Sequence, residues 1–336
     1  MKIFITGGAG FIGANIARHY LKQGIETVVY DNLSRLGVEN NLSWMKKNYP
    51  NVIFLKEDVR NFPMLSRSMR GSDLVFHMAS QVAVTSSVKN PLLDFEINAL
   101  GTLNVLEAAR AQKKPPIVVY ASTNKVYGGM GNVDLIKKKT RYDFKNSHLR
   151  RGITEDVQID FHSPYGCSKG AGDQYVHDYA RIYGLRTLVF RQSCIYGDFQ
   201  YGNEDQGWVA HFMRKLIKGE TITIYGDGRQ VRDLLYVRDL IDCYLRSVAK
   251  ISKTSGRVYN IGGGRRFSTS LIELMPLIER ECRTKAKVKY SQWRPGDQRV
   301  YISDCSKAHK DFGWEPVTSI DQGLVSLHQW MRAAHT

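Results

Sequence analysis

A glycine-rich turn near the amino terminus constrains the fold more than any other feature of the chain. Residues 6–13 read TGGAGFIG, directly after the apolar run KIFIT and before a helix-length amphipathic stretch. Gly7 permits a tight turn, Gly10 removes a side chain from the path of a pyrophosphate, and Gly13 lets helix and strand pack closely. The turn therefore predicts the first strand–turn–helix unit of a dinucleotide-binding domain.

Apolar runs of strand length alternate with helix-length stretches beyond this turn. The runs are KIFIT, TVVYD, NVIFLKED, LVFHMAS, IVVYAS and TLVFRQS, and helices are expected near 12–23, near 95–112 and from Tyr165 to about Tyr183. This alternation predicts an α/β fold, a Rossmann-type doubly wound parallel sheet with helices on both faces. The later, shorter elements, which include a last helix near 320–333, predict a smaller mixed α/β substrate lobe.

A carboxylate at the end of the second strand bears on the choice of dinucleotide. Asp31 lies about 20 residues after the turn, where it can accept hydrogen bonds from both ribose hydroxyls and repel a 2′-phosphate. This favours NAD, although Arg35 can also accept a 2′-phosphate and keeps NADP as an alternative. The expected cofactor-binding residues are Gly7, Gly10, Phe11, Ile12, Gly13, Asp31, Asn32, Ser34, Arg35, Asp58, Val59, Ala79, Ser80, Asn98, Tyr165, Lys169 and Gln192.

The chain of 336 residues is long enough for two lobes. We expect residues 1–198 to form the NAD-binding domain, with 230–250 returning to it, and residues 199–336 to form most of the substrate lobe. At the end of the fourth strand, His77 is either a histidine satisfied by its neighbours or a group with a direct chemical role. The stretch from Gly128 to Ser163 has no clear periodicity and predicts a functional lid or a partly ordered segment.

Tyr165 and Lys169 are four residues apart on an expected helix, so they share one face and rise about 6 Å along its axis. A tyrosine titrates near pH 10, so it is a base at neutral pH only if positive charge lowers its pKa. Lys169 and the nicotinium ring can supply that charge, and Thr123 at a strand end can share the proton of a substrate hydroxyl. Behind a dinucleotide fingerprint, this trio predicts hydride transfer at a carbinol, with Thr123, Tyr165 and Lys169 as catalytic residues.

Several blocks together resemble the extended short-chain dehydrogenase/reductase superfamily: TGGAGFIG, Asp31, STNKVYG (122–128) and SPYGCSK (163–169). The blocks DNLSR, DFEIN, DFHSPYGCSKG, DQGWV and QVRD make the chain similar to the CDP-tyvelose 2-epimerase family, also called CDP-paratose 2-epimerases. The resemblance implies an epimerase that inverts C2 of a CDP-activated hexose through a 2-keto intermediate, with tightly bound NAD. The implied sugars are of the CDP-paratose/CDP-tyvelose or CDP-glucose/CDP-mannose type.

Asn124 and Lys125 separate this chain from nucleotide-sugar 4,6-dehydratases, which carry an Asp-Glu pair at the matching positions. An Asn-Lys pair offers no two carboxylates for elimination of water, so dehydration is disfavoured. The alternative for these two residues is that they only cap the strand. The expected substrate-binding residues are Thr85, Ser86, Thr123, Asn124, His162, Gln206, Trp208, Arg232, Asp297 and Arg299.

Arg232 and Arg299 are expected on the diphosphate, because guanidinium groups bind phosphate oxygens in a bidentate manner. They sit in turns that match the superfamily's diphosphate-binding positions, and Asp297 is expected to accept from the ribose. Surface salt bridges are the alternative for the arginines, and buried polar packing is the alternative for the remaining substrate candidates.

Composition leaves two rival functions open. The net charge of +16 suits a protein with polyanionic ligands, and it also suits an RNA-binding or nucleotide-sensing protein on a Rossmann scaffold. Epimerisation or oxidation at C4 of another nucleotide sugar is the enzymatic rival. Part of the charge excess lies in 137–151, expected to be either an exposed mobile loop or a wall above a diphosphate.

Five scattered cysteines without a CxxC pair indicate reduced thiols, with no metal site and no disulfide framework. The start lacks the pattern of a cleavable signal, and no segment is apolar enough to span a bilayer, so we expect a cytoplasmic protein without membrane or nucleic-acid partners. Amphipathic helices near 95–112 and 166–183 can pair subunits, which predicts a homo-oligomer, a dimer or a tetramer.

Overall fold

The computed structural model describes residues 1–131, 133–294 and 297–334. The chain divides into two compact units. Unit 1 comprises 1–123, 163–191 and 241–259, and unit 2 comprises 124–162, 192–240 and 260–336. No described helix is long and apolar enough to cross a membrane.

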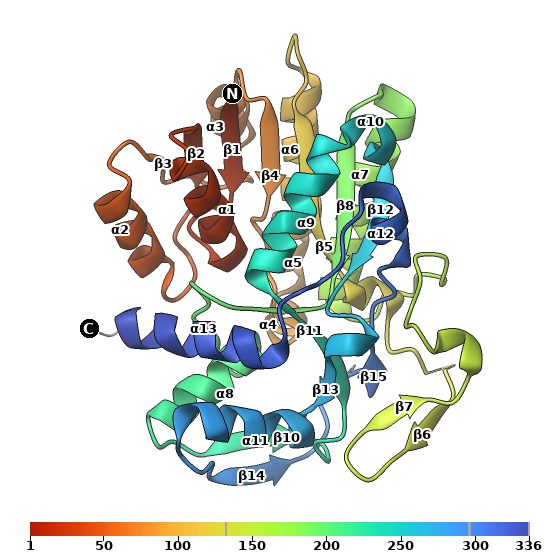
Figure 1. The fold of residues 1–336 in the computed structure, drawn as a ribbon. Helices are drawn as coiled ribbons and strands as arrows, with labels where there is room; N and C mark the ends of the chain where they lie inside the picture. Colours follow the sequence, from red (N-terminus) through yellow and green to blue (C-terminus); the bar gives the residue numbers. More distant parts are fainter. Residues whose placement is uncertain (132, 295–296, 335–336) are drawn as a thin grey trace. The chain divides into compact units, whose positions relative to one another are not determined.

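Unit 1 is built on a seven-stranded sheet in the order β12-β8-β5-β4-β1-β2-β3 (Figure 1). Its strands are β1 (Lys2–Thr6), β2 (Glu26–Tyr30), β3 (Ile53–Leu55), β4 (Leu74–His77), β5 (Ile117–Thr123), β8 (Thr187–Gln192) and β12 (Arg257–Ile261). The pairs β1–β2, β1–β4, β2–β3 and β4–β5 are parallel. The order reverses between β1 and β4, and such a switch point is where doubly wound sheets bind dinucleotides. The expected Rossmann-type parallel sheet is confirmed.

Of the helices expected for unit 1, those near 12–23 and from Tyr165 to about Tyr183 are present, and the one near 95–112 is divided. The helices of this unit are α1 (Phe11–Leu21), α2 (Val38–Asn48), α3 (Phe62–Met69), α4 (Val84–Lys89), α5 (Pro91–Phe95), α6 (Gly101–Arg110), α7 (Ser163–Tyr183), α9 (Val237–Ala249) and α10 (Ile251–Thr254). The single helix expected near 95–112 is instead α5, a π-helical turn η1 (Glu96–Leu100) and α6. A π-turn of this kind is frequent at functional sites.

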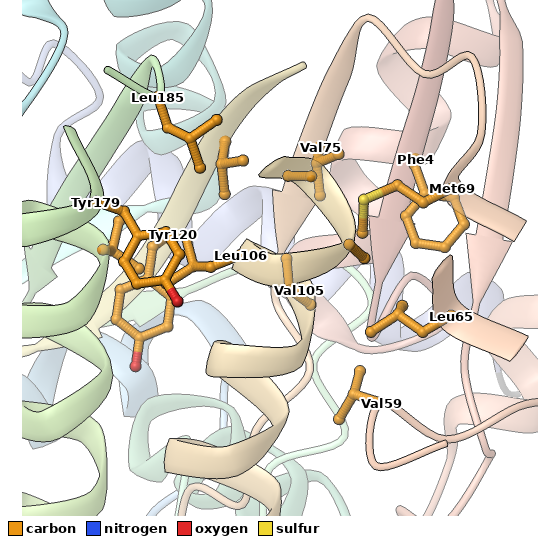
Figure 2. Packing of buried hydrophobic residues seen from close by; sticks show 14 of the residues in the cluster. Phe4, Val59, Leu65, Met69, Val75, Val105, Leu106, Tyr120, Tyr179 and Leu185 are labelled. Atoms are coloured by element: carbon orange, nitrogen blue, oxygen red, sulfur yellow. The ribbon is translucent and has the colours of Figure 1, made fainter. Parts of the chain in front are cut away.

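One apolar core holds α3, α6 and α7 against the sheet, because buried side chains from all three helices meet those of the strands. Figure 2 shows Val105 and Leu106 of α6 between Tyr120 and Tyr179 on one side and Leu65 and Met69 on the other. Several of these side chains are completely buried, and each fully buried large apolar side chain contributes about 1.5–3 kcal/mol.

Unit 2 contains small sheets and a helical layer. Its strands are β6 (Leu135–Lys137), β7 (Tyr142–Phe144), β9 (Cys194–Tyr196), β10 (Ile222–Tyr225), β11 (Val231–Tyr236), β13 (Ser268–Ser270), β14 (Val288–Ser291) and β15 (Val300–Tyr301). Its helices are α8 (Trp208–Ile217), α11 (Leu271–Cys282), α12 (Ser306–Phe312) and α13 (Ile320–Ala334), with short 3-10 turns η2 (Asn124–Tyr127), η3 (Ser147–Leu149) and η4 (Arg265–Phe267). β10 pairs with β14, and β11 pairs with β9, β13 and β15.

The units differ from the expected domain boundaries in three places. Residues 124–162 and 192–198 belong to unit 2 rather than to a domain ending at 198, and the returning segment is 241–259 rather than 230–250. The physical reason is a separate apolar core, in which Phe144, Leu149 and Ile153 pack with Val231 and Ile302. Local sequence patterns cannot reveal contacts of such long range.

The stretch from Gly128 to Ser163 has more structure than its lack of periodicity suggests. β6 and β7 form an antiparallel hairpin, with Ile136 opposite Asp143. Arg141 binds the carboxylate of Glu273 at the start of α11, and Asp143 accepts from both Lys138 and Arg265. Ion pairs with distant segments thus stabilise this hairpin. The sequence pattern alone predicts only a loop here.

Candidate active site

The glycine turn has the geometry that a pyrophosphate requires. Gly7 has φ +64°, and a Cβ there would lie 2.6 Å from the amide nitrogen of Ala79. A Cβ on Gly13 would lie 2.2 Å from the carbonyl oxygen of Gly7. Gly10 is the N-cap of α1, whose first turn begins with Phe11 and Ile12 and contains no acidic residue. The positive end of the helix dipole is therefore available for an anionic group.

Asp31 stands directly after β2 and organises this region. Its Oδ2 accepts from the amide of Ala9 at 3.0 Å, and its Oδ1 accepts from the amide of Leu33 at 2.8 Å. Burial raises the pKa of this carboxyl, while the backbone N–H groups and Arg35 oppose the shift. Leu33 has φ +58°, a conformation that costs a non-glycine residue free energy and that the Asp31 hydrogen bond helps to hold.

The residues expected near the adenosine lie in unit 1 as the strand order requires. Asn32 donates to Asp58 at 2.8 Å, and the amide of Ser34 donates to the Asn32 side chain at 3.0 Å. Val59 is buried in the core beside α6. Arg35 is exposed to solvent over much of its surface. Atoms packed around its guanidinium still lower its pKa, while the charges of Tyr165 and Asp31 oppose this shift.

His77 and Asn98 connect the end of β4 to its neighbours. The His77 ring contacts Thr6 Oγ1 at 2.7 Å and Thr102 Oγ1 at 3.0 Å, and burial lowers its pKa to about 3. This neutral, fully partnered ring matches the structural alternative for His77. Asn98 accepts from Ser80 at 2.8 Å and donates to Ser168 at 3.1 Å, so it ties the strand end to α7.

The structure places the three predicted catalytic residues of unit 1 in buried positions. Thr123 ends β5 and hydrogen-bonds the Tyr165 side chain. Burial raises the pKa of Tyr165 to about 12, an effect that the Thr123 hydrogen bond and Arg35 reduce. Lys169 Nζ lies 4.2 Å from the centroid of the Tyr120 ring, and burial lowers its pKa to about 7. Without added positive charge, Tyr165 is therefore protonated at neutral pH.

A buried ion pair supports α7 one turn beyond Lys169. Arg191 of β8 binds both carboxylate oxygens of Asp173 at 2.9 Å, and Ser122 of β5 donates to Asp173 at 2.7 Å. The pair joins α7 to two strands in a fixed geometry, which a bidentate guanidinium–carboxylate contact favours. Sequence reasoning missed this pair, because the two residues are 18 positions apart on different elements.

Within unit 2, Arg232, Asp297 and Lys125 form a second polar cluster. Arg232 Nη2 donates to Asp297 at 3.1 Å, and the Arg232 side chain is largely buried. Burial and the Arg232 charge lower the pKa of Lys125 to about 8. Asn124 donates to Gln298 at 3.1 Å and so anchors the turn η2 to the segment before β15. Lys125 was not among the expected site residues, although the sequence placed it beside Asn124.

The other expected substrate residues are distributed over both units. Arg299 lies 5.4 Å from the centroid of Tyr142, and His162 contacts Asp160 at 3.0 Å. Trp208 donates to Cys194 at 3.5 Å, and the amide of Gln206 donates to Asn203 at 2.9 Å. Their substrate contacts stay predictions, and so do those of Thr85 and Ser86, exposed on α4. The cofactor contact of Gln192, which is buried at the end of β8, also stays a prediction.

The glycine turn and Asp31 in unit 1 have the form of a dinucleotide-binding site on a Rossmann-type sheet. The model of the NAD dependent epimerase/dehydratase family matches residues 3–262, and the chain belongs to this family. NAD is accordingly its cofactor. The chain fits NAD because side chains at Gly7 or Gly13 would fill the turn, and because Asp31 stands at the end of β2.

Individual relatives share nearly the whole chain. It is 43% identical to CDP-paratose 2-epimerase of Salmonella typhi over 98% of this chain and 99% of the relative. A UDP-glucose 4-epimerase of Thermotoga maritima, solved with UDP-glucose, is 31% identical, with a TM-score of 0.84 and complete coverage of both chains. A Thermus thermophilus UDP-glucose 4-epimerase in complex with NAD is 29% identical, with a TM-score of 0.81 over 99% of this chain and 100% of the other.

Proposed function

We propose that this protein is an NAD-dependent epimerase that inverts C2 of a CDP-activated hexose. The observation that carries the proposal is the buried Thr123–Tyr165–Lys169 group on a dinucleotide-binding sheet, in a chain 43% identical to a CDP-paratose 2-epimerase. The Asn124–Lys125 pair supports epimerisation over dehydration, because neither side chain is a carboxylic acid that could help to expel water.

The chain's own residues account for the proton transfers. Tyr165 as phenolate removes the C2 hydroxyl proton, while Thr123 holds the same oxygen through its hydroxyl group. Lys169, when protonated, stabilises the phenolate, and the cationic nicotinamide ring adds to this effect. Bound NAD supplies reversible hydride acceptance, so no external reductant is consumed. The keto sugar then presents its opposite face, and Tyr165 returns the proton to the oxygen.

Further substrate contacts are assigned to residues of unit 2. Arg232 binds the diphosphate, Asp297 orients Arg232 and accepts from the ribose, and Arg299 adds a second guanidinium. Trp208 and Gln206 contact the sugar. Lys125 adds positive charge beside Arg232, which favours a polyanionic ligand at this cluster.

A direct assay tests the function. The purified protein, without added cofactor, is incubated with CDP-paratose and with CDP-glucose, and the products are followed by NMR. The account predicts the C2 epimer and NAD released on denaturation of the purified protein. A product inverted at C4 would instead support the UDP-glucose 4-epimerase reading, which the Thermotoga and Thermus structures favour by their fold and identity. Salt-sensitive RNA binding without turnover of any CDP-sugar would support the non-enzymatic rival.

Oligomerisation is a further part of the proposal. Exposed apolar side chains lie on α4, α5 and α7: Val88, Leu92, Phe95, Tyr175, Ile182 and Tyr183. Because α4 and α5 both pack on α7, these side chains lie on neighbouring elements, which supports a homodimer or a dimer of dimers. Sedimentation equilibrium is expected to give two or four chains per particle, and a monomer at micromolar concentration would contradict it.

Five free cysteines support a reducing, cytoplasmic location.

A further inference from the structure

Asp94 is a buried carboxylate beside the catalytic helix that the mechanism above does not use. It lies near the end of α5, two residues before the π-turn η1 begins, and is only 1% exposed. Its Oδ2 accepts from Ser168 Oγ, and its Oδ1 accepts from Asn98 Nδ2 at 3.2 Å. Asn98 also donates to Ser168 at 3.1 Å, which closes a triangle of three side chains. Ser168 precedes Lys169 in the chain.

The charge of Asp94 reaches both members of the catalytic pair. It raises the pKa of Tyr165 and the pKa of Lys169, as a nearby negative charge must for both groups. Ser168 also contacts the backbone carbonyl of Tyr165 at 3.2 Å, so the same hydroxyl joins Asp94 to the first turn of α7.

Other charges around the pair are already compensated or distant. Asp173 also acts on Lys169, but Arg191 neutralises it through two hydrogen bonds. Asp94 makes no salt bridge with any described residue, and its partners Ser168 and Asn98 are neutral. The groups that act on the pair come from six elements, and they are Arg35 after β2, His77 of β4, Asp94 of α5, Tyr120 and Thr123 of β5, Asp173 of α7, and Arg191 of β8 through Asp173.

We propose that Asp94 is a positioning residue of the epimerase: held by Ser168 and Asn98, its carboxylate fixes the first turn of α7 and retains a proton on the Tyr165–Lys169 pair. The inference rests on the proposed function for its kinetic readout. The cation whose charge acts on Asp94 is Lys169, which is not in salt-bridge contact with it. The negative charge offsets part of the cost of burying the Lys169 ammonium, and it delays formation of the phenolate until positive charge is added.

The negative charge of Asp94 raises both apparent pKa values of the Tyr165–Lys169 pair, whichever of the two residues loses its proton first. Loss of one proton takes the pair from a charge of +1 to 0, and loss of the second takes it from 0 to −1. A neighbouring negative charge opposes both steps. Asp94→Asn removes the charge and keeps the shape, so both apparent pKa values of the pair should fall by about one unit.

The test compares pH profiles of kcat/KM in the NAD-containing enzyme with its CDP-hexose substrate. Asp94→Asn is expected to move the acid limb down by about one pH unit. Ser168→Ala removes the hydrogen bond to Asp94 but keeps the Asp94 charge. The acid limb of its pH profile should therefore stay at the wild-type pH, while kcat falls. Asp94→Glu restores the charge and returns the limb toward the wild-type position, and Asp178→Asn on the exposed face of α7 is the matched control.

A second readout separates this inference from the proposed function. The tyrosinate absorbance of Tyr165 is measured during a pH titration, as the difference between each protein and its Tyr165→Phe derivative. Asp94→Asn should lower the midpoint of that step even if no CDP-hexose is turned over. An unchanged midpoint and an unchanged acid limb in Asp94→Asn would overturn the proposal and leave Asp94 with a purely structural role. If Asp94→Asn does not fold, Asp94→Ser provides the same comparison.

Discussion

Tyr165 and Lys169 have opposite pKa shifts with one cause. Burial disfavours the charged form of each, so the pKa of Tyr165 rises to about 12 and that of Lys169 falls to about 7. The Lys169 ammonium and the nicotinium ring are both expected to lower the pKa of the phenol. In the folded chain, burial of Lys169 disfavours its charged form and so weakens the first of these contributions. The chemistry of the pair therefore depends on cofactor binding.

Replacement of Tyr165 by Phe tests the assignment of the base. The variant keeps the buried ring and removes the proton acceptor, so kcat should fall by about 10²–10⁴-fold, the usual contribution of general acid–base catalysis. Steady-state kinetics measure the loss, with release of NAD from the denatured variant as a check on cofactor binding. Tyr175→Phe, on an exposed part of the same helix, should retain wild-type activity. A Tyr165→Phe enzyme with more than a tenth of the wild-type rate would contradict the assignment.

The buried ammonium of Lys169 is expected to lower the stability of the protein, although the proposed reaction needs it. Its folded pKa, about 7, lies below the ordinary lysine value of about 10.4, so burying it costs free energy. The cost is complete below pH 7 and disappears as the pH rises through about 10.4. Lys169→Met should therefore be inactive yet melt at a higher temperature at pH 7, by about 2–4 °C per kcal/mol of cost relieved. Calorimetry of both dinucleotide-free proteins at pH 7 and 10 measures the difference, which should shrink at pH 10; a lower melting temperature for the variant at pH 7 would count against it.

At the scale of elements, close backbone contacts fix the glycine turn that precedes α1. Gly13 packs against the backbone of Gly7 and Gly8, and the approach leaves no space for a side chain. Gly7 N donates to the carbonyl of Tyr30 at 2.8 Å, so the turn is also fixed to β2. A substitution in this turn should therefore weaken NAD binding and leave the structure of unit 2 unchanged.

Gly13→Ala provides the test at this scale. The new Cβ would lie 2.2 Å from the Gly7 carbonyl oxygen, so the turn must move. We expect at least a tenfold weaker retention of NAD and a loss of about 1–3 kcal/mol in the free energy of unfolding. NAD content after purification and denaturant unfolding measure the two effects. Gly131→Ala, where a Cβ would meet nothing within 4 Å, is the control and should behave as wild type.

For the whole molecule, local patterns predict the features that depend on neighbours in sequence. The strand ends, the glycine turn and the Tyr165–Lys169 spacing all follow from short segments. Asp94 was missed because its partner Ser168 lies 74 residues away. The anchor of Asn124 at Gln298 is 174 residues away, and the hairpin β6–β7 depends on the Arg141–Glu273 ion pair across 132 residues. Long-range contacts of polar side chains leave no periodic signal, so the sequence alone cannot place them.

The net charge of +16 has a partial explanation in the same contacts. Within the basic segment 137–151, Lys137 pairs with Asp227 and Lys138 with Asp143, and Arg265 from another segment also binds Asp143. The partly exposed Lys137–Asp227 pair is worth less than about 1 kcal/mol. A polyanionic ligand stays the simplest account of the remaining excess.

The most direct measurement follows the hydrogen at C2. CDP-paratose carrying deuterium at C2 is converted in ordinary water by the purified enzyme, and both epimers are examined by NMR. If the C2 hydrogen moves as a hydride between sugar and nicotinamide while Tyr165 exchanges only the hydroxyl proton, the deuterium stays at C2 in the product. Replacement of the label by solvent hydrogen would show that a base removes a C2 proton, and the account given for Tyr165 and NAD would be wrong.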